Sequence, residues 1–291
     1  MTSSKVRYLI FFQYFGTKYS GVMKAPSHQA ILGVENYLEH AVSKLRPAND
    51  IRLWISSRTD SGVHALCNSL HVDIQRKDGK PPFSEDVLVK ALNYHLQPEP
   101  ISILSASIVP DNFHARYRAL SRTYVYRLVT GCSHRSELPV FEKNLCWSVY
   151  GSHLNGTAVQ EAAQFLLGTH DFSTFRSISS EMPFKSPVKT LHQVHITPSV
   201  GFLSHYTYRN LQFWELVFKS RSFLYKQVRR MTGALVQVGQ GRLTPLDIKD
   251  LLEARDSMAF PQNCIAPPDG LFLKEVEYEE DFFLTAEESS T

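Results

Sequence analysis

The stretch IRLWISSRTDSGVHALCNSLHVDIQ, residues 51–75, places a charged turn between two apolar segments. IRLWIS predicts a strand that ends at Arg58, and NSLHVDIQ alternates apolar and polar residues as the next strand would. Between them, Arg58 and Asp60 precede Gly62, and glycine permits a tight turn. Charges at such a point are either a solvated strand end or a carboxylate that acts on a substrate. From these residues alone, the solvated strand end is the commoner case.

Outward from this stretch, β-type and helical patterns alternate along the chain. Strands are predicted at residues 6–14, 101–109, 123–130, 211–220 and 270–278. Helices are predicted at 28–45, 85–96, 155–167 and 223–238, with another starting at Thr244. In the first helix, Ile31, Val34 and Leu38 share the face expected to be buried. Ser84 is expected to cap the second helix.

The two halves of this pattern have a related layout, which predicts an internal duplication. The predicted fold class is α+β, with two similar α/β-sandwich halves whose mainly antiparallel sheets meet at a central basic catalytic cleft. The predicted domains are an N-terminal half at residues 1–113, a C-terminal half at 114–274, and the end of the last strand with an acidic tail at 275–291.

Charge and composition restrict the partner. The 291 residues are 43% hydrophobic and 20% charged, which is typical of a globular protein. Residues 275–291 hold seven acidic and no basic residues, so the net charge of +3 leaves about +10 on residues 1–274. A basic body favours a polyanionic partner. The acidic tail cannot bind phosphate and is expected to be solvated.

Cysteines and termini restrict the compartment. Four separated cysteines, with no Cys-x-x-Cys pair, favour an intracellular protein with reduced thiols. The sequence contains no run of 18 apolar residues, so no membrane span is predicted. Four basic residues precede the first acidic residue, Glu35, and such a composition is typical of a mitochondrial targeting sequence. The expected location is therefore intracellular, with mitochondria favoured over cytoplasm or nucleus.

Arginines and tyrosines alternate where the two halves join. Residues 112–136 contain no acid and five arginines, with Tyr117, Tyr124 and Tyr126 among them. In a strand, Tyr124 and Tyr126 share a face. They either pack in a core or form a stacking platform for unpaired RNA bases, and the pattern leaves both open.

A second basic segment, KSRSFLYKQVRR at residues 219–230, opens the predicted helix 223–238. Lys226, Arg229 and Arg230 would lie in its first two turns. Arg229 would sit at the rim of the buried face, where it either extends to solvent or pairs with a carboxylate. No histidine spacing indicates a metal site, and Gly239-Gln240-Gly241 lacks the setting of a nucleotide-binding loop. Neither a metal nor another cofactor is expected.

Together these segments resemble the TruA-type tRNA pseudouridine synthases, and most closely the animal pseudouridine synthase-like branch. SSRTDSGVHAL is similar to the family signature, and VPDNFHARYRALSRTYVYRL to its Phe-His-Ala-Arg and Tyr-x-Tyr segment. GTHDFSTFR, FLYKQVRRMTGALVQVG and APPDGLFLKEV match later blocks in the same order. The resemblance covers nearly the whole chain.

The resemblance implies an isomerase that detaches uracil from ribose and rejoins it through carbon 5. Asp60 would be the nucleophile, with engagement of the sugar or of the base left open. Arg229 would pair with Asp60, Tyr124 would stack on the target base, and Arg58 would replace the flipped base. Further RNA contacts are implied for Thr59, His64, His114, Arg116, Arg118, Arg122, Arg176, Lys226 and Arg230. The implied partners are RNA, with tRNA favoured, and a second copy in a homodimer; no membrane is implied.

Three positions depart from the family pattern. Val22 and Met23 follow Gly21 in place of Trp-Gln, Asn68 replaces a glutamine, and Ser61 replaces an alanine. These departures leave substrate choice open. A catalytically silent RNA-binding protein of the same fold is the main alternative, followed by a hydrolase that frees uracil and a basic structural protein.

Overall fold

A computed structural model describes residues 5–150, 153–178, 186–202 and 210–282 of the chain. The predicted tail therefore lies outside the described residues from position 283 on. The chain forms two compact units, Met1–Arg122 with Leu273–Thr291, and Thr123–Phe272. The predicted domain ranges stay predictions. Both units combine helices with a mainly antiparallel sheet, so the predicted α+β class is confirmed.

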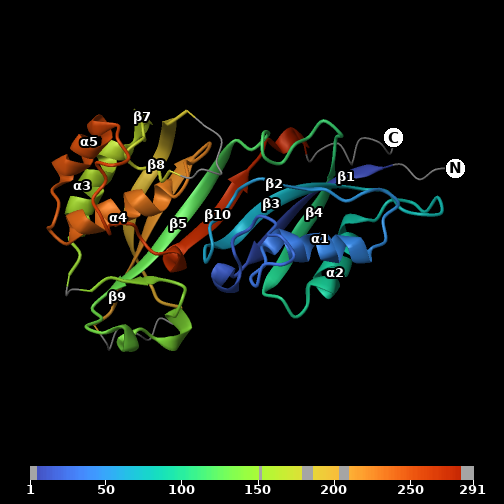
Figure 1. The fold of residues 1–291 in the computed structure, drawn as a ribbon, viewed down its shortest axis with the longest axis horizontal. Coiled ribbons are helices and arrows are strands. Elements are labelled where there is room, and N and C mark those ends of the chain that lie inside the picture. Colours follow the sequence, from blue (N-terminus) through green and yellow to red (C-terminus); the bar gives the residue numbers. More distant parts are fainter. Residues whose placement is uncertain (1–4, 151–152, 179–185, 203–209, 283–291) are drawn as a thin grey trace. The chain divides into compact units, whose positions relative to one another are not determined.

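The first unit has a sheet with the strand order β4-β1-β3-β10, and β2 pairs with residues 70–72 of β3. Its elements are β1 (Val6–Tyr14), α1 (Val34–Lys44), β2 (Leu53–Ile55), β3 (His64–Ile74), α2 (Glu85–Leu96), β4 (Ile101–Val109) and β10 (Leu271–Glu277), which begins in the second unit. β1 runs antiparallel to both β3 and β4. Figure 1 shows α1 and α2 on one face of these strands.

The core of the first unit lies between the sheet and the two helices. Tyr8, Ile10 and Phe12 alternate along β1 and are almost completely buried. Leu38 of α1 and Leu88 of α2 are buried as well. Each such side chain stabilises the fold by roughly 1.5–3 kcal/mol relative to exposure. Leu9, between Tyr8 and Ile10, is buried as well, so β1 has buried side chains on both of its faces.

The second unit has the strand order β5-β9-β8-β7, and β6 pairs in parallel with β5. Its elements are β5 (Ser121–Thr130), which starts in the first unit, β6 (Trp147–Ser148), α3 (Gly156–Leu166), β7 (Gly168–Asp171), β8 (Val188–Ser199), β9 (Gln212–Ser220), α4 (Gln227–Gly239) and α5 (Pro245–Ala254). Short 3₁₀ turns lie at Gly16–Lys18, Arg135–Glu137, Val140–Glu142, Pro268–Gly270 and Glu280–Phe282.

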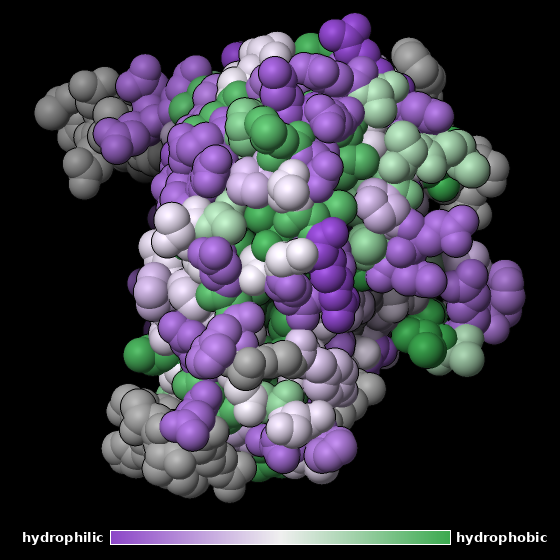
Figure 2. All heavy atoms as spheres, turned by 90° about the vertical axis from the view of Figure 1, so that its left-hand side faces the viewer, coloured by the Kyte–Doolittle hydropathy of each residue, from purple (hydrophilic) through white to green (hydrophobic). Residues whose placement is uncertain are grey.

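Helix α3 packs against β8 and against both α4 and α5. Figure 2 shows the side on which Figure 1 labels α3 and α5, and hydrophilic residues cover most of it, with hydrophobic ones between them. Helices that cover a sheet typically expose polar residues to solvent and turn apolar residues toward the sheet. No described helix has the length and apolar character needed to cross a membrane.

Several element boundaries differ from the sequence-based prediction. Residues 28–33 precede α1 as turns, so Ile31 is exposed rather than buried with Leu38. Helix α4 starts at Gln227 rather than at 223, because Lys226 adopts a left-handed backbone conformation and serves as the N-cap. Ser84 precedes α2 but makes no capping hydrogen bond, whereas Thr244 caps α5 as expected.

Candidate functional site

Asp60 lies on a four-residue turn that precedes β3. The Val63 amide donates to the Asp60 carbonyl at 3.1 Å, and Gly62, the third residue of the turn, has a φ of 80°. A positive φ at this position is what a type II turn requires, and glycine adopts it without strain. The backbone of the turn thus fixes the position from which the half-buried Asp60 side chain extends.

Two glycines fit closely against this turn. A Cβ on Gly16 would lie 1.9 Å from the Val63 carbonyl oxygen, and one on Gly21 would lie 2.8 Å from that of Thr59. The Gly16 amide also donates to Nδ1 of His64 at 3.1 Å. Because only glycine leaves room for these approaches, the loop after β1 and the Asp60 turn form one rigid unit.

Thr59 and His64 flank the turn and are both buried. The Thr59 hydroxyl and the Tyr14 hydroxyl are 2.7 Å apart and share a hydrogen bond. The Thr59 carbonyl accepts from the Val22 amide at 3.2 Å. Thr59 and His64, which were both predicted to contact RNA, therefore form hydrogen bonds within the protein on either side of Asp60.

Arg58 points to the surface beside the turn. Its side chain is exposed, and its charge is close enough to Glu35 to lower the pKa of that carboxyl. Burial is the larger effect and raises the pKa of Glu35 above its ordinary value. An exposed guanidinium one residue from the turn is available to a ligand that contacts Asp60.

Arg122 supports the turn from within the first unit. Its guanidinium is buried and donates from Nη2 to the Ser56 hydroxyl at 3.1 Å and to the Arg116 carbonyl at 2.9 Å. Its Nε donates to the Ser57 hydroxyl at 3.2 Å. The amide of Asn68, which replaces the family glutamine, donates to the Ser57 carbonyl at 3.0 Å. Arg122 thus holds the segment that leads into Arg58.

Three further predicted RNA contacts lie in the segment after β4. His114 and Arg116 are half-buried, and Arg118 is exposed with its guanidinium over the Phe282 ring. His114 packs against His71 of β3, with ring centroids 4.7 Å apart. Nδ1 of His71 accepts from the Ala115 amide at 3.1 Å, which fixes the segment on the sheet.

His71 makes the stability of the first unit depend on pH. Burial and, to a smaller extent, the charges of Arg7 and His114 lower its pKa to about 4. Between pH 6.5 and 4 the unfolded chain therefore binds a proton that the folded chain does not, and stability falls as the pH falls. From pH 7 to pH 5 the loss is about 2 kcal/mol.

His71→Gln, which keeps an acceptor for the Ala115 amide, should remove this part of the pH dependence in urea unfolding at the two pH values. An equal loss in wild type and variant would assign the effect to other groups.

In the second unit, Tyr124 is buried in β5. Its ring meets that of Phe223 edge to face, with centroids 5.2 Å apart. Tyr126, two residues further, shares the same face of the strand and is completely buried, and its hydroxyl donates to the Pro267 carbonyl at 2.8 Å. Burial raises its pKa well above the ordinary value, so its hydroxyl remains protonated.

Arg229 is held by the segment that precedes β10. Its Nε donates to the Ala266 carbonyl at 2.8 Å, and its own carbonyl accepts from the Ala266 amide at 3.1 Å. One turn later in α4, a Cβ on Gly233 would lie 1.6 Å from the Cys264 carbonyl oxygen. The glycine therefore lets the segment cross α4 in direct contact and fix the arginine.

The other predicted contacts of the second unit gather around the start of α4. Nη1 of Arg230 donates to the carbonyls of Thr174 and Arg176, and its guanidinium lies over the Phe260 ring. The Ser177 amide donates to the Tyr225 carbonyl, next to Lys226. The loop GTHDFSTFR is thus bound to the first turn of α4.

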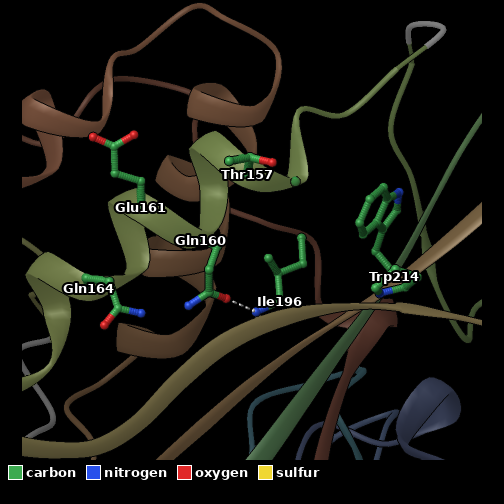
Figure 3. Close-up of a pocket in the computed structure, with 8 residues that line it drawn as sticks. Thr157, Gln160, Glu161, Gln164, Ile196 and Trp214 are labelled. Carbon is green, nitrogen blue, oxygen red and sulfur yellow. Dashed lines mark hydrogen bonds between the residues drawn. The ribbon is translucent and has the colours of Figure 1, made fainter.

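A pocket of about 540 Å³ lies elsewhere in the second unit, and none of the predicted residues lines it. Figure 3 shows it between α3 and the sheet, with Gln160 bonded to the Ile196 amide at 3.1 Å. Gly156 faces the Trp214 ring, which a Cβ would approach to 2.9 Å. The polar and aromatic side chains that line the pocket thus contribute to the packing of α3. Among the described residues, no group of His, Cys, Asp and Glu could hold a metal ion.

The predicted residues thus lie in both units, with Asp60 in one unit and Tyr124, Arg229 and the residues at the start of α4 in the other. The sequence prediction missed the residues that position them, above all Gly16, Gly21 and Ala266. Glycines in the loop GTKYSG were the available signal, because a glycine often marks a close backbone approach.

The chain is similar to known proteins over most of its length. Residues 10–118 and 162–279 match the family model described as tRNA pseudouridine synthase. The tRNA pseudouridine synthase-like 1 proteins of Xenopus laevis and Homo sapiens are 65% and 51% identical to the chain, over 96% and 95% of its length and 93% and 91% of theirs. The tRNA pseudouridine synthase A of Caulobacter sp. (strain K31) is 39% identical over 94% of the chain and 98% of its own length. The chain belongs to the tRNA pseudouridine synthase family, whose members are isomerases.

Proposed function

We propose that this protein isomerises uridines of tRNA to pseudouridine, with Asp60 as the nucleophile. The family match supports the reaction and the substrate class. The observation that carries the role of Asp60 is its position on a turn fixed by backbone contacts to two glycines of the loop after β1. A catalytic carboxylate requires such a fixed starting point, because small displacements of a reacting group cost large factors in rate.

In the proposed reaction, a carboxylate oxygen of Asp60 attacks C1′ of the ribose. The C1′–N1 bond breaks, and its electron pair stays on the uracil. The uracil turns, its C5 attacks C1′, and the bond to Asp60 breaks. The proton at C5 is then lost to water and N1 gains one, so uridine and pseudouridine are isomers. Carboxylates serve the same role in glycoside cleavage.

Tritium release from a tRNA transcript labelled at C5 of uridine tests this proposal. The wild-type protein should release tritium to water without free uracil, and Asp60→Ala should not. Free uracil would indicate a hydrolase. No release from the transcript or from cellular RNA, with RNA binding intact, would support the catalytically silent binding protein and contradict the proposal.

Arg229 is proposed to pair with the Asp60 carboxylate and to hold its orientation. Arg229→Ala should retain the fold but lower turnover by on the order of 10²-fold or more. Arg242→Ala removes an exposed arginine just after the same helix and is the matched control. Single-turnover pseudouridine formation measures both variants, and a near-normal rate in Arg229→Ala would remove the assigned role.

Tyr124 is proposed to stack on the target base and to move a proton during the rearrangement. Tyr124→Phe keeps the ring and removes the hydroxyl, so RNA affinity should be retained while turnover falls by about 10²-fold. Tyr124→Leu should weaken binding as well. Affinity and single-turnover rate are measured on the same transcript, and full turnover in Tyr124→Phe would restrict the residue to stacking.

Assembly and location are also proposals. A homodimer would supply basic loops from two copies to one tRNA, and sedimentation of the purified protein with and without tRNA tests it. The basic N-terminal segment before Glu35 supports a mitochondrial location. Imaging of the full-length protein with a C-terminal tag tests this second proposal.

A further inference from the structure

Four aromatic rings form a continuous cluster in the first unit, which we name the aromatic patch: Trp54, His71, His114 and Tyr117. Trp54 of β2 pairs with His71 of β3, and their rings stack with centroids 6.2 Å apart. His114 contacts Trp54 at 5.3 Å and Tyr117 at 4.3 Å between ring centroids. Three segments that are distant in sequence thus place their rings in contact.

The two outer rings of the aromatic patch are open to solvent. Trp54 is 43% exposed and Tyr117 is 68% exposed, whereas His71 between them is 2% exposed. Single exposed hydrophobic residues are ordinary, whereas neighbouring ones that form a patch often mark a binding site. The buried His71 and the half-buried His114 contact these rings and provide rigid support for a planar ligand.

Arginines accompany both exposed rings. The guanidinium of Arg52 lies 5.5 Å from the Trp54 ring, and that of Arg116 lies 5.9 Å from the Tyr117 ring. The pKa values of both histidines are lowered, chiefly by burial, so these rings are neutral at pH 7. Positive charge beside neutral aromatic faces is the combination that binds single-stranded nucleic acid, in which arginines meet phosphates and bases stack on rings.

The aromatic patch is bonded to the segment that leads to Asp60. The Arg116 carbonyl and the Ser56 and Ser57 hydroxyls all accept from the guanidinium of Arg122. Ser56 also follows the strand that carries Trp54. One buried side chain therefore connects the patch to the turn of the proposed nucleophile within a single compact unit.

We propose that the aromatic patch binds unpaired nucleotides of the RNA substrate by stacking, outside the position of the reacting uridine. The proposal rests on the proposed function only in taking RNA as the partner. Bases would stack on Trp54 and Tyr117 while Arg52 and Arg116 contact the adjoining phosphates. Such contacts would add affinity for tRNA without taking part in the reaction.

Equilibrium binding of an unmodified tRNA transcript tests the patch. In the Asp60→Asn background, Trp54→Ala and Tyr117→Ala should each weaken binding about tenfold, the usual effect of removing a stacked ring. Tyr94→Ala, which removes a 73% exposed tyrosine from α2 of the same unit, should not change the affinity. Unchanged affinity in both patch variants would overturn the proposal.

Tryptophan fluorescence gives a readout that needs no turnover. Of the three tryptophans, Trp54 is exposed, Trp147 is half-buried and Trp214 is 8% exposed. A single-stranded oligouridylate should quench the emission of the Asp60→Asn protein, and a blunt RNA duplex should quench it far less. Trp54→Phe should bind the oligonucleotide with nearly unchanged affinity but lose the quenching.

These outcomes separate the two proposals. If wild type releases no tritium from any RNA but the oligonucleotide still quenches Trp54, the proposed isomerase fails and the patch stands. If tritium is released and quenching is absent, or equal in Trp54→Phe, the patch proposal fails alone. Binding of a protein at the patch without any response to RNA would also contradict it.

Discussion

Asp60→Asn should bind a tRNA transcript as tightly as the wild-type protein and form almost no pseudouridine. The amide has nearly the same shape as the carboxylate but cannot serve as a nucleophile at C1′. Removing a nucleophile lowers turnover by on the order of 10⁴-fold or more. The turn that carries residue 60 is set by the Val63 amide and by Gly62, neither of which the substitution changes.

Nucleoside analysis of the digested transcript measures the product, and fluorescence anisotropy measures the affinity. Asp111→Asn, which changes an exposed carboxylate of the same unit, is the matched control and should retain full turnover. Substantial pseudouridine formation by Asp60→Asn would exclude Asp60 as the nucleophile.

Gly16→Ala should destabilise the first unit and also disturb the Asp60 turn. The new Cβ would lie 1.9 Å from the Val63 carbonyl oxygen, a backbone atom that cannot turn aside as a side chain would. Forcing extra volume into a packed site typically costs about 1–3 kcal/mol. A shift of the turn by about 1 Å would in addition lower turnover by about 10²-fold.

Urea unfolding gives the stability, and single-turnover kinetics under conditions where the variant remains folded give the rate. Gly241→Ala is the control, because its Cβ would meet no atom within 4 Å and the substitution costs only the strain of a positive φ of 70°. Wild-type stability in Gly16→Ala would contradict the close approach on which the placement of Asp60 rests.

Regular elements with a clean apolar period were predictable from sequence. β1 and β4 have the predicted bounds, because β-branched or aromatic residues recur at every second position of β1 and isoleucines recur along β4. β8 was not predicted, since its buried residues Leu191, Val194 and Ile196 do not follow a regular alternation. The predicted start of α1 was wrong. Gly33 contacts the backbone of Met23 so closely that a Cβ would lie 1.8 Å from the Met23 carbonyl oxygen, and no local sequence pattern reveals this contact.

The candidate site was likewise predictable from sequence only in part. The residues proposed to react were assigned from the family resemblance, whose motifs around Asp60 and at the basic start of α4 are continuous in sequence. The supporting roles of Arg122 and Arg230 were not predicted, since their acceptors include Ser56 and Thr174, which are 66 and 56 residues away. A charge in a sequence shows its sign, whereas its partners depend on the fold.

The central claim, that this chain makes pseudouridine through Asp60, is tested most directly in cells. Pseudouridine is mapped in tRNA from cells that lack the protein and from the same cells supplied with wild type or Asp60→Asn at equal levels. The account predicts uridines whose modification disappears with the protein and returns with wild type alone. Full restoration by Asp60→Asn, or a pseudouridine map that the loss of the protein leaves unchanged, would contradict it.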